Sequence, residues 1–107
     1  MKQPPHPAKD DMTLTAVLAA LGDPVRLSIV AEVSRGERGS SDFDCAVASS
    51  TLSHHIRALR EAGILNHRKE GTRCFVSLRP ELEASFPGLL ASVLRHAPGK
   101  PAEREAP

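Results

Sequence analysis

The segment from Ser49 to Leu65, SSTLSHHIRALREAGIL, constrains the fold of this 107-residue chain more than any other stretch. At about 100° per residue, Leu52, Ile56 and Leu59 share one side of a helix, with His55 at its edge. The opposite side is polar and holds Ser50, Ser53, His54, Arg57 and Glu61. Gly63 suits the left-handed position that often follows the last turn of a helix. The pattern predicts an amphipathic helix over residues 50–62 that buries one face and presents a polar one.

Two helices are expected before this segment. In residues 11–21 the apolar positions follow helical spacing, at Leu14, Val17, Leu18 and Leu21. Gly22 ends that helix, and Asp23 with Pro24 is a typical N-cap and first position of a second one, which runs to Ser34. Residues 36–48 give only a weak signal, for a polar loop followed by one or two helical turns around positions 43–47.

A hairpin and a further helix are expected after the central segment. The runs ILNHRK and TRCFVSL alternate as strands do, and Glu70-Gly71 between them is a turn-forming pair. Cys74, Val76 and Leu78 alternate onto one face of the second strand. Residues 80–96 return to helical spacing, with an interruption near Pro87.

Length and composition predict one small domain. We expect it to span residues 11–96, with disordered, proline-rich tails at 1–10 and 97–107. A core of this size gains from being shared with a second copy of the chain. The N-terminus lacks the apolar run of a signal peptide, and no stretch approaches the roughly 20 apolar residues of a membrane span. The sequence therefore predicts a cytoplasmic protein with no membrane partner.

Charge is concentrated in the middle of the chain although the net charge is only +1. Residues 51–79 hold six Lys/Arg against two Asp/Glu, whereas residues 1–50 hold five against seven and residues 80–107 three against four. A local basic block is the footprint that a nucleic-acid-binding surface needs even when the whole chain is nearly neutral.

Three runs, LAALGDPVRLSIVAEV, SSTLSHHIRALREAGIL and HRKEGTRCFVSL, resemble the ArsR/SmtB family of bacterial transcriptional regulators over residues 14–78. The resemblance implies a mainly α fold with a small β-hairpin wing: a homodimeric winged helix-turn-helix protein. It also implies that the protein represses transcription by binding an inverted-repeat operator in double-stranded DNA. An effector usually releases such a repressor from its operator. The family's recognition helix corresponds to residues 50–62 and its wing to 67–73. Its dimer surface corresponds to the first and last helices, including Leu14, Leu18, Leu21, Leu90 and Leu94.

The polar face of the central helix suits the major groove. Short polar or hydrogen-bonding side chains near its N-terminus, Ser50, Ser53, His54 and Arg57, can reach base edges, and Arg57 is the best candidate for a bidentate contact with guanine. Other residues are better suited to phosphates: Ser49, Thr51, Arg68, Lys69 and Arg73. Ala48 stands where the family commonly has a capping serine, so Ser49 is expected to take over the cap.

Catalysis is disfavoured by geometry. Ser53 and His54 are neighbours on a helix and do not face each other, as a nucleophile and its base must. His55 is expected to be partly buried. We therefore expect no enzyme, no catalytic residue and no cofactor. A winged-helix module that binds protein instead of DNA is the alternative from another class, and it would present an apolar face where this helix is polar.

A metal- or thiol-responsive sensor within the same family is the other alternative. Cys45 stands alone, and Glu81, Glu83 and His96 do not reproduce the family's ligand spacing, so no metal site is predicted. Cys45 precedes the recognition helix, where oxidation could tilt it, but Asp42 and Asp44 disfavour the reactive thiolate. Cys74, on the apolar face of a strand, is expected to be a core residue. Redox sensing through Cys45 or Cys74 is the less favoured hypothesis, and the sequence identifies neither the effector nor the operator.

Overall fold

The computed structural model describes residues 5–39 and 49–97 of the chain. A single 3-10 turn, η1 (Lys9–Asp11), precedes helix α1 (Leu14–Leu21). The predicted start of this helix at residue 11 is wrong, because the hydroxyl of Thr13 accepts a hydrogen bond from the N–H of Ala16 and so caps the helix there. Helix α2 (Pro24–Val33) begins as predicted: the Asp23 carboxylate accepts hydrogen bonds from two backbone N–H groups of its first turn, at 2.8 and 3.1 Å.

Helix α3 (Ser49–Glu61) is the amphipathic helix that the sequence predicts, displaced by one residue at each end. Gly63 follows it in the left-handed region with a φ of 91°, as the terminator role requires. The chain then enters the sheet directly.

Strands β2 (Leu65–Glu70) and β3 (Arg73–Leu78) form the predicted antiparallel hairpin, with Leu65 opposite Leu78 and Glu70 opposite Arg73. Gly71 occupies the tight turn with a φ of 61°. Residues 38 and 39, expected to be loop, instead form the short strand β1 (Arg38–Gly39), so the strand order is β1-β3-β2. A two-residue strand is too short to carry an alternation signal in the sequence.

The last helical region divides as predicted into α4 (Pro80–Ser85) and α5 (Leu89–His96), with Pro87 and Gly88 between them. Gly88 has a φ of 80° and turns the chain from one helix into the other. The core collects side chains from all the helices and from β2 and β3; its most enclosed members are Val17, Ile29, Val30, Leu59, Ile64, Leu65, Val76 and Leu82.

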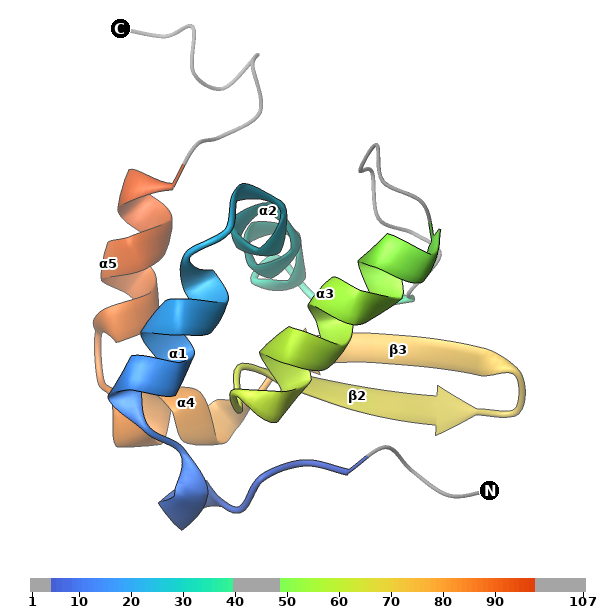
Figure 1. Cartoon of the computed structure of the whole chain (residues 1–107), viewed down its shortest axis with the longest axis horizontal. Helices are drawn as coiled ribbons and strands as arrows, with labels where there is room; N and C mark the ends of the chain where they lie inside the picture. The colour runs from blue at the N-terminus through green and yellow to red at the C-terminus, as the bar shows by residue number, and fades with distance from the viewer. Residues whose placement is uncertain (1–4, 40–48, 98–107) are drawn as a thin grey trace, which may run out of the picture.

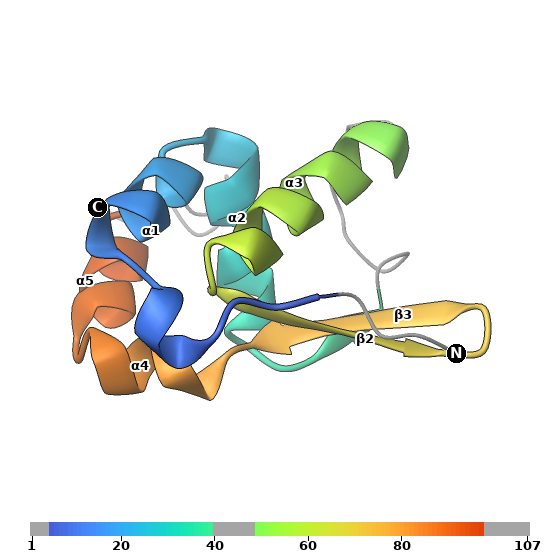
Figure 2. The same cartoon turned by 60° about the horizontal axis from the view of Figure 1, so that its bottom comes forward.

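Two groups of elements lie at opposite ends of the molecule (Figure 1). Helices α1 and α5 lie side by side at one end, and the β2–β3 hairpin extends to the opposite end. Figure 2 shows the same arrangement from a second side, with α3 lying over the hairpin. Among the described residues no single helix is long and apolar enough to cross a membrane; α1 and α2 would pass that test only as a pair, and they are bent by 102° at their junction.

Part of the expected N-terminal tail is placed by the structure. Residues 5–10 include the start of η1, and the His6 ring contacts the backbone of β2. This contact joins residues 61 positions apart in the sequence and links the segment before residue 11 to the sheet. The helical turns predicted around positions 43–47, and Cys45, lie outside the described residues, as do residues 98–107.

Candidate nucleic-acid interface

The outward face of α3 is polar and exposed. The residues that the sequence predicts for this face, Ser50, Ser53, His54, Arg57 and Glu61, are all exposed, and so is Thr51. Arg57, the predicted guanine reader, forms an ion pair with Glu61 one turn later, with 2.9 Å between Nε and Oε2. This bond holds the pKa of the Glu61 carboxyl below its ordinary value. The pair engages Nε of Arg57, so leaving Glu61 would free the whole guanidinium for a base.

The two adjacent histidines have different surroundings, as their helical positions predict. His54 is exposed, whereas His55 is buried and its Nδ1 accepts a hydrogen bond of 3.1 Å from Nε of Arg26. Asp23 caps the same turn of α2 that carries Arg26. Asp23 and Arg26, both within the sequence run DPVRL, thus connect the start of α2 to the middle of α3. Helical spacing alone did not identify Arg26 as the partner of His55.

The last turn of α3 is joined to the base of the hairpin by Arg60. Its guanidinium is buried, and Nη1 lies 3.3 Å from Nδ1 of His67 on β2. Burial first, and then the nearby charges of Arg60, Lys69 and His6, lower the pKa of the His67 imidazole. A neutral His67 can accept from the guanidinium, so this contact fixes the hairpin against the recognition helix.

Two predicted phosphate-binding arginines share one aromatic ring on the hairpin. The guanidinium carbons of Arg68 and Arg73 lie 4.6 and 5.3 Å from the centre of the Phe75 ring. Arg68 also forms ion pairs with Glu37, at 3.0 Å, and with Glu70. Lys69 and Arg73 are exposed near the hairpin turn, whereas Arg68 is held back on the outer face of the sheet.

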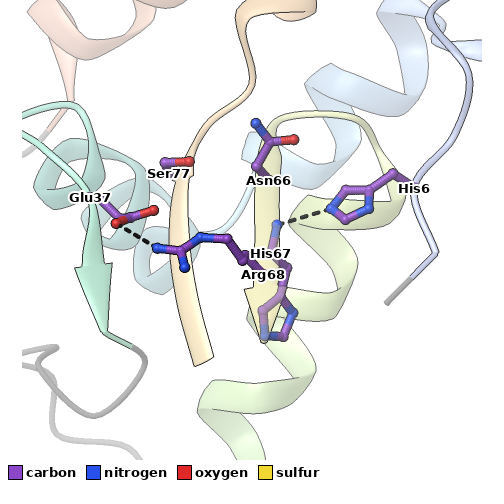
Figure 3. Close-up of a pocket in the computed structure, with 6 residues that line it drawn as sticks. All are labelled: His6, Glu37, Asn66, His67, Arg68 and Ser77. Carbon is purple, nitrogen blue, oxygen red and sulfur yellow. Dashed lines mark hydrogen bonds and ion pairs between the residues drawn. The ribbon is translucent and has the colours of Figure 1, made fainter. Parts of the chain in front are cut away.

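A cavity of about 450 Å³ opens beside the outer face of the sheet (Figure 3). The residues that line it all have polar or charged side chains and come from the N-terminal segment, the segment before β1, strand β2 and strand β3: His6, Glu37, Asn66, His67, Arg68 and Ser77. No pattern in the sequence indicates His6 or Glu37 at this place, because neither belongs to a periodic element and both lie far along the chain from β2.

The predicted dimer residues divide into two groups. Leu14 and Leu18 are 45% and 46% exposed, and they are the exposed large hydrophobic side chains in residues 5–39 and 49–97. Leu94 is half-buried on α5, beside α1. Leu21 and Leu90 belong instead to the core of the protomer, 5% and 9% exposed, so a second copy cannot gain much by covering them. The prediction that Leu21 and Leu90 lie on the dimer surface is therefore corrected. The helical spacing of apolar residues in α1 and α5 did not separate residues that face the protomer core from those that face away from it.

The candidate metal residues of the last helical region have other partners, and Cys45 lies outside the described residues. Glu81 pairs with Arg79, the Glu83 carboxylate accepts from the N–H of Gly88, and Nδ1 of His96 lies 2.9 Å from the Ser92 carbonyl oxygen. Over the described ranges, no three His, Cys, Asp or Glu side chains gather as metal ligands would. Cys74 carries a free, half-buried thiol, so it is less enclosed than a core residue.

Comparison with known proteins gives a consistent result. Residues 21–68 match the family described as a helix-turn-helix domain. The uncharacterized HTH-type transcriptional regulator YceK of Bacillus subtilis is 34% identical over 92 residues, which cover 78% of this chain and 89% of YceK. The biofilm growth-associated repressor of Xylella fastidiosa is 29% identical over 96 residues, covering 83% and 84% of the two chains.

A solved structure matches the fold as well. It is the homodimeric winged helix-turn-helix DNA-binding domain of Mb0332 from Mycobacterium bovis, a possible ArsR-family transcriptional regulator. The two structures superpose with a TM-score of 0.63 at 28% identity, over 77% of this chain and 78% of the other.

Proposed function

Because the chain belongs to the ArsR family of winged helix-turn-helix transcriptional regulators, we propose that it represses transcription as a homodimer bound to an inverted-repeat operator. The recognition helix α3 enters the major groove and the β2–β3 wing follows the adjacent backbone. The observation that carries this proposal is the exposed polar face of α3. The helix lies beside the β2–β3 hairpin, which carries Arg68, Lys69 and Arg73 (Figure 2).

Base reading falls to the first turns of α3. Ser50, Ser53 and His54 offer donors and acceptors of short reach, and Arg57 can make the bidentate contact with guanine once Glu61 releases it. In this proposal Glu61 is part of the reading mechanism, because its carboxylate competes with the DNA for Arg57.

Phosphate contacts position the dimer without reading sequence. We assign them to Ser49 and Thr51 at the start of α3 and to Lys69 and Arg73 on the wing. For Arg68 we propose a phosphate contact that requires it to leave its ion pairs with Glu37 and Glu70.

Dimerisation is assigned to the end of the molecule opposite the wing. Leu14 and Leu18, one turn apart on α1, form an exposed apolar strip that a second copy can cover around a twofold axis, and half-buried Leu94 lies on the neighbouring helix α5. The homodimeric Mycobacterium bovis domain supports this assignment. An inverted repeat in the operator is the DNA counterpart of that axis.

We also propose that the protein has no catalytic activity and works in the cytoplasm, where its DNA partner is. The likeness to the Xylella fastidiosa repressor favours repression over activation. Neither a metal nor a cofactor enters this proposal. A role in binding protein through α3 is not favoured, because the outward face of that helix is polar.

The proposal is tested by adding the purified protein to a DNA fragment from the promoter beside its own gene. We expect a shifted complex that survives an excess of random duplex DNA. Equal competition by promoter and random DNA would reject a sequence-specific repressor.

A further inference from the structure

The segment from His6 to Met12, here called the strap, begins beside the edge strand β2, where His6 contacts the backbone, and continues through η1 to the start of α1 (Figures 1 and 2). Since the strand order is β1-β3-β2, the outer backbone N–H groups of β2 have no strand to pair with. The ring of His6 satisfies one of them: its Nε2 accepts a hydrogen bond of 2.9 Å from the N–H of His67 (Figure 3).

The strap has a second point of attachment beside the end of α3. A Cβ atom added to Gly63 would lie only 2.7 to 2.9 Å from three side-chain atoms of Met12. Met12 therefore occupies space that exists because residue 63 is glycine, and it packs against the core there. The strap thus contacts both the residue that terminates the recognition helix and the base of the wing.

His67 is where these elements converge. Its backbone N–H binds the strap, and its imidazole accepts from Arg60 of α3 at 3.3 Å. Asn66 and Arg68, the neighbours of His67 on β2, line the cavity that His6 borders. A shift of the strap would therefore move His67, which joins the wing to the recognition helix.

We propose that the strap sets the position of the wing relative to α3, and that His6 is a positioning residue for DNA binding. The inference rests on the proposed function for its effect on DNA. A dimer must place α3 and wing on DNA together, so a wing already held in place spares the complex an ordering cost. His6 need not touch DNA to have this effect.

The chemistry of the bond gives a conservative variant and a disruptive one. A ring nitrogen that accepts a hydrogen bond carries no proton, and the side-chain oxygen of glutamine can take its place as acceptor. His6→Gln should preserve the contact with the His67 N–H, whereas His6→Ala removes it. Pro5→Ala is the matched control, because Pro5 is exposed and directly precedes His6.

The test measures hydrogen exchange at the His67 amide in the full-length protein without DNA, and affinity for the promoter fragment in the same variants. For His6→Ala we expect exchange about fivefold faster, the equivalent of one modest hydrogen bond, and DNA binding weaker by about threefold to fivefold. His6→Gln and Pro5→Ala should match the parent in both measurements.

Three results would overturn the inference: unchanged exchange in His6→Ala, equal acceleration in His6→Gln and His6→Ala, or faster exchange with undiminished DNA affinity. A parent protein that binds no promoter DNA would reject the proposed function instead. In that case the exchange measurement alone decides whether the strap holds the wing.

Discussion

Two side-chain contacts set the surroundings of α3: Arg26 donates to His55, and Arg57 forms an ion pair with Glu61. Helical spacing in the sequence correctly separated exposed His54 from buried His55. It did not reveal that His55 accepts from Arg26, nor that Arg57 is paired with Glu61. The first contact joins residues 29 positions apart, which no local pattern encodes. The second is an i,i+4 pair, and the spacing itself was the available signal.

Glu61 offers the first prediction at this scale. Replacing it by glutamine removes one negative charge beside Arg57 and releases the guanidinium. Glu61→Gln should tighten binding to random duplex DNA by about threefold to tenfold and steepen its salt dependence by about one counterion. Titrations at several salt concentrations check this; binding to random DNA that matches the parent at every salt concentration would show that the pair does not restrain Arg57.

His67 gives a pH dependence. Its pKa in the folded protein lies below the ordinary value of 6.5, because of burial and the nearby Arg60. As pH falls below 6.5 the unfolded chain binds a proton more readily than the folded one, so the contribution of His67 is fully present above that pH and is lost toward the folded pKa.

Denaturant unfolding at pH 7.5 and 5.5 checks the prediction. The parent should lose more stability on acidification than His67→Asn, which keeps an acceptor for Arg60 but does not titrate. The other histidines are common to both proteins. The same loss in both would contradict a role for His67.

At the scale of elements, the helices and strands that could be predicted are those whose ends are marked by residues close in the sequence. The cap and proline of α2, the glycine after α3 and the turn between β2 and β3 are each set by backbone chemistry, so they were found from sequence. The strand β1 and the strap were not, because their positions come from hydrogen bonds to β3 and β2 far along the chain. The exposed polar residues of α3 were predictable for the same reason as the helix itself.

The α2 cap is the prediction for an element. Asp23→Ala removes the carboxylate that accepts from the first turn of α2, so we expect a loss of about 1 kcal/mol in unfolding free energy. The hydrogen bond from the Arg26 N–H lowers the pKa of Asp23 below its ordinary 3.8. Its contribution is therefore present above pH 3.8 and is lost as the pH falls through the folded pKa.

Asp23→Asn is the matched control, since asparagine also caps helices well and should retain most of the stability. Thermal or denaturant unfolding near neutral pH compares the three proteins. Equal stability of Asp23→Ala and the parent would mean that the cap adds nothing to the fold.

At the scale of the whole molecule, the exposed strip on α1 and the wing lie at opposite ends (Figure 1). This separation lets a second copy cover the strip while both wings stay open to DNA. The sequence predicted that α1 and α5 would serve in dimerisation, but the burial of Leu21 and Leu90 is a property of tertiary packing that periodicity does not resolve.

Dimerisation is tested at this strip. Leu18→Glu places a charge where the second copy would bury a leucine, so sedimentation at micromolar concentration should find the parent as a dimer and the variant as a monomer. Ser28→Glu, on the exposed side of α2, should remain a dimer. A dimeric Leu18→Glu protein would move the interface elsewhere.

The central claim is that α3 reads bases while the wing holds the backbone, and the most direct test compares Arg57→Ala with Lys69→Ala on promoter and random DNA over a range of salt concentrations. Arg57→Ala should lose about 1–3 kcal/mol on the promoter site and relax its base preference. Lys69→Ala should weaken binding to both DNAs alike and reduce the salt slope by about one. Equal losses on promoter and random DNA for both variants would contradict the claim.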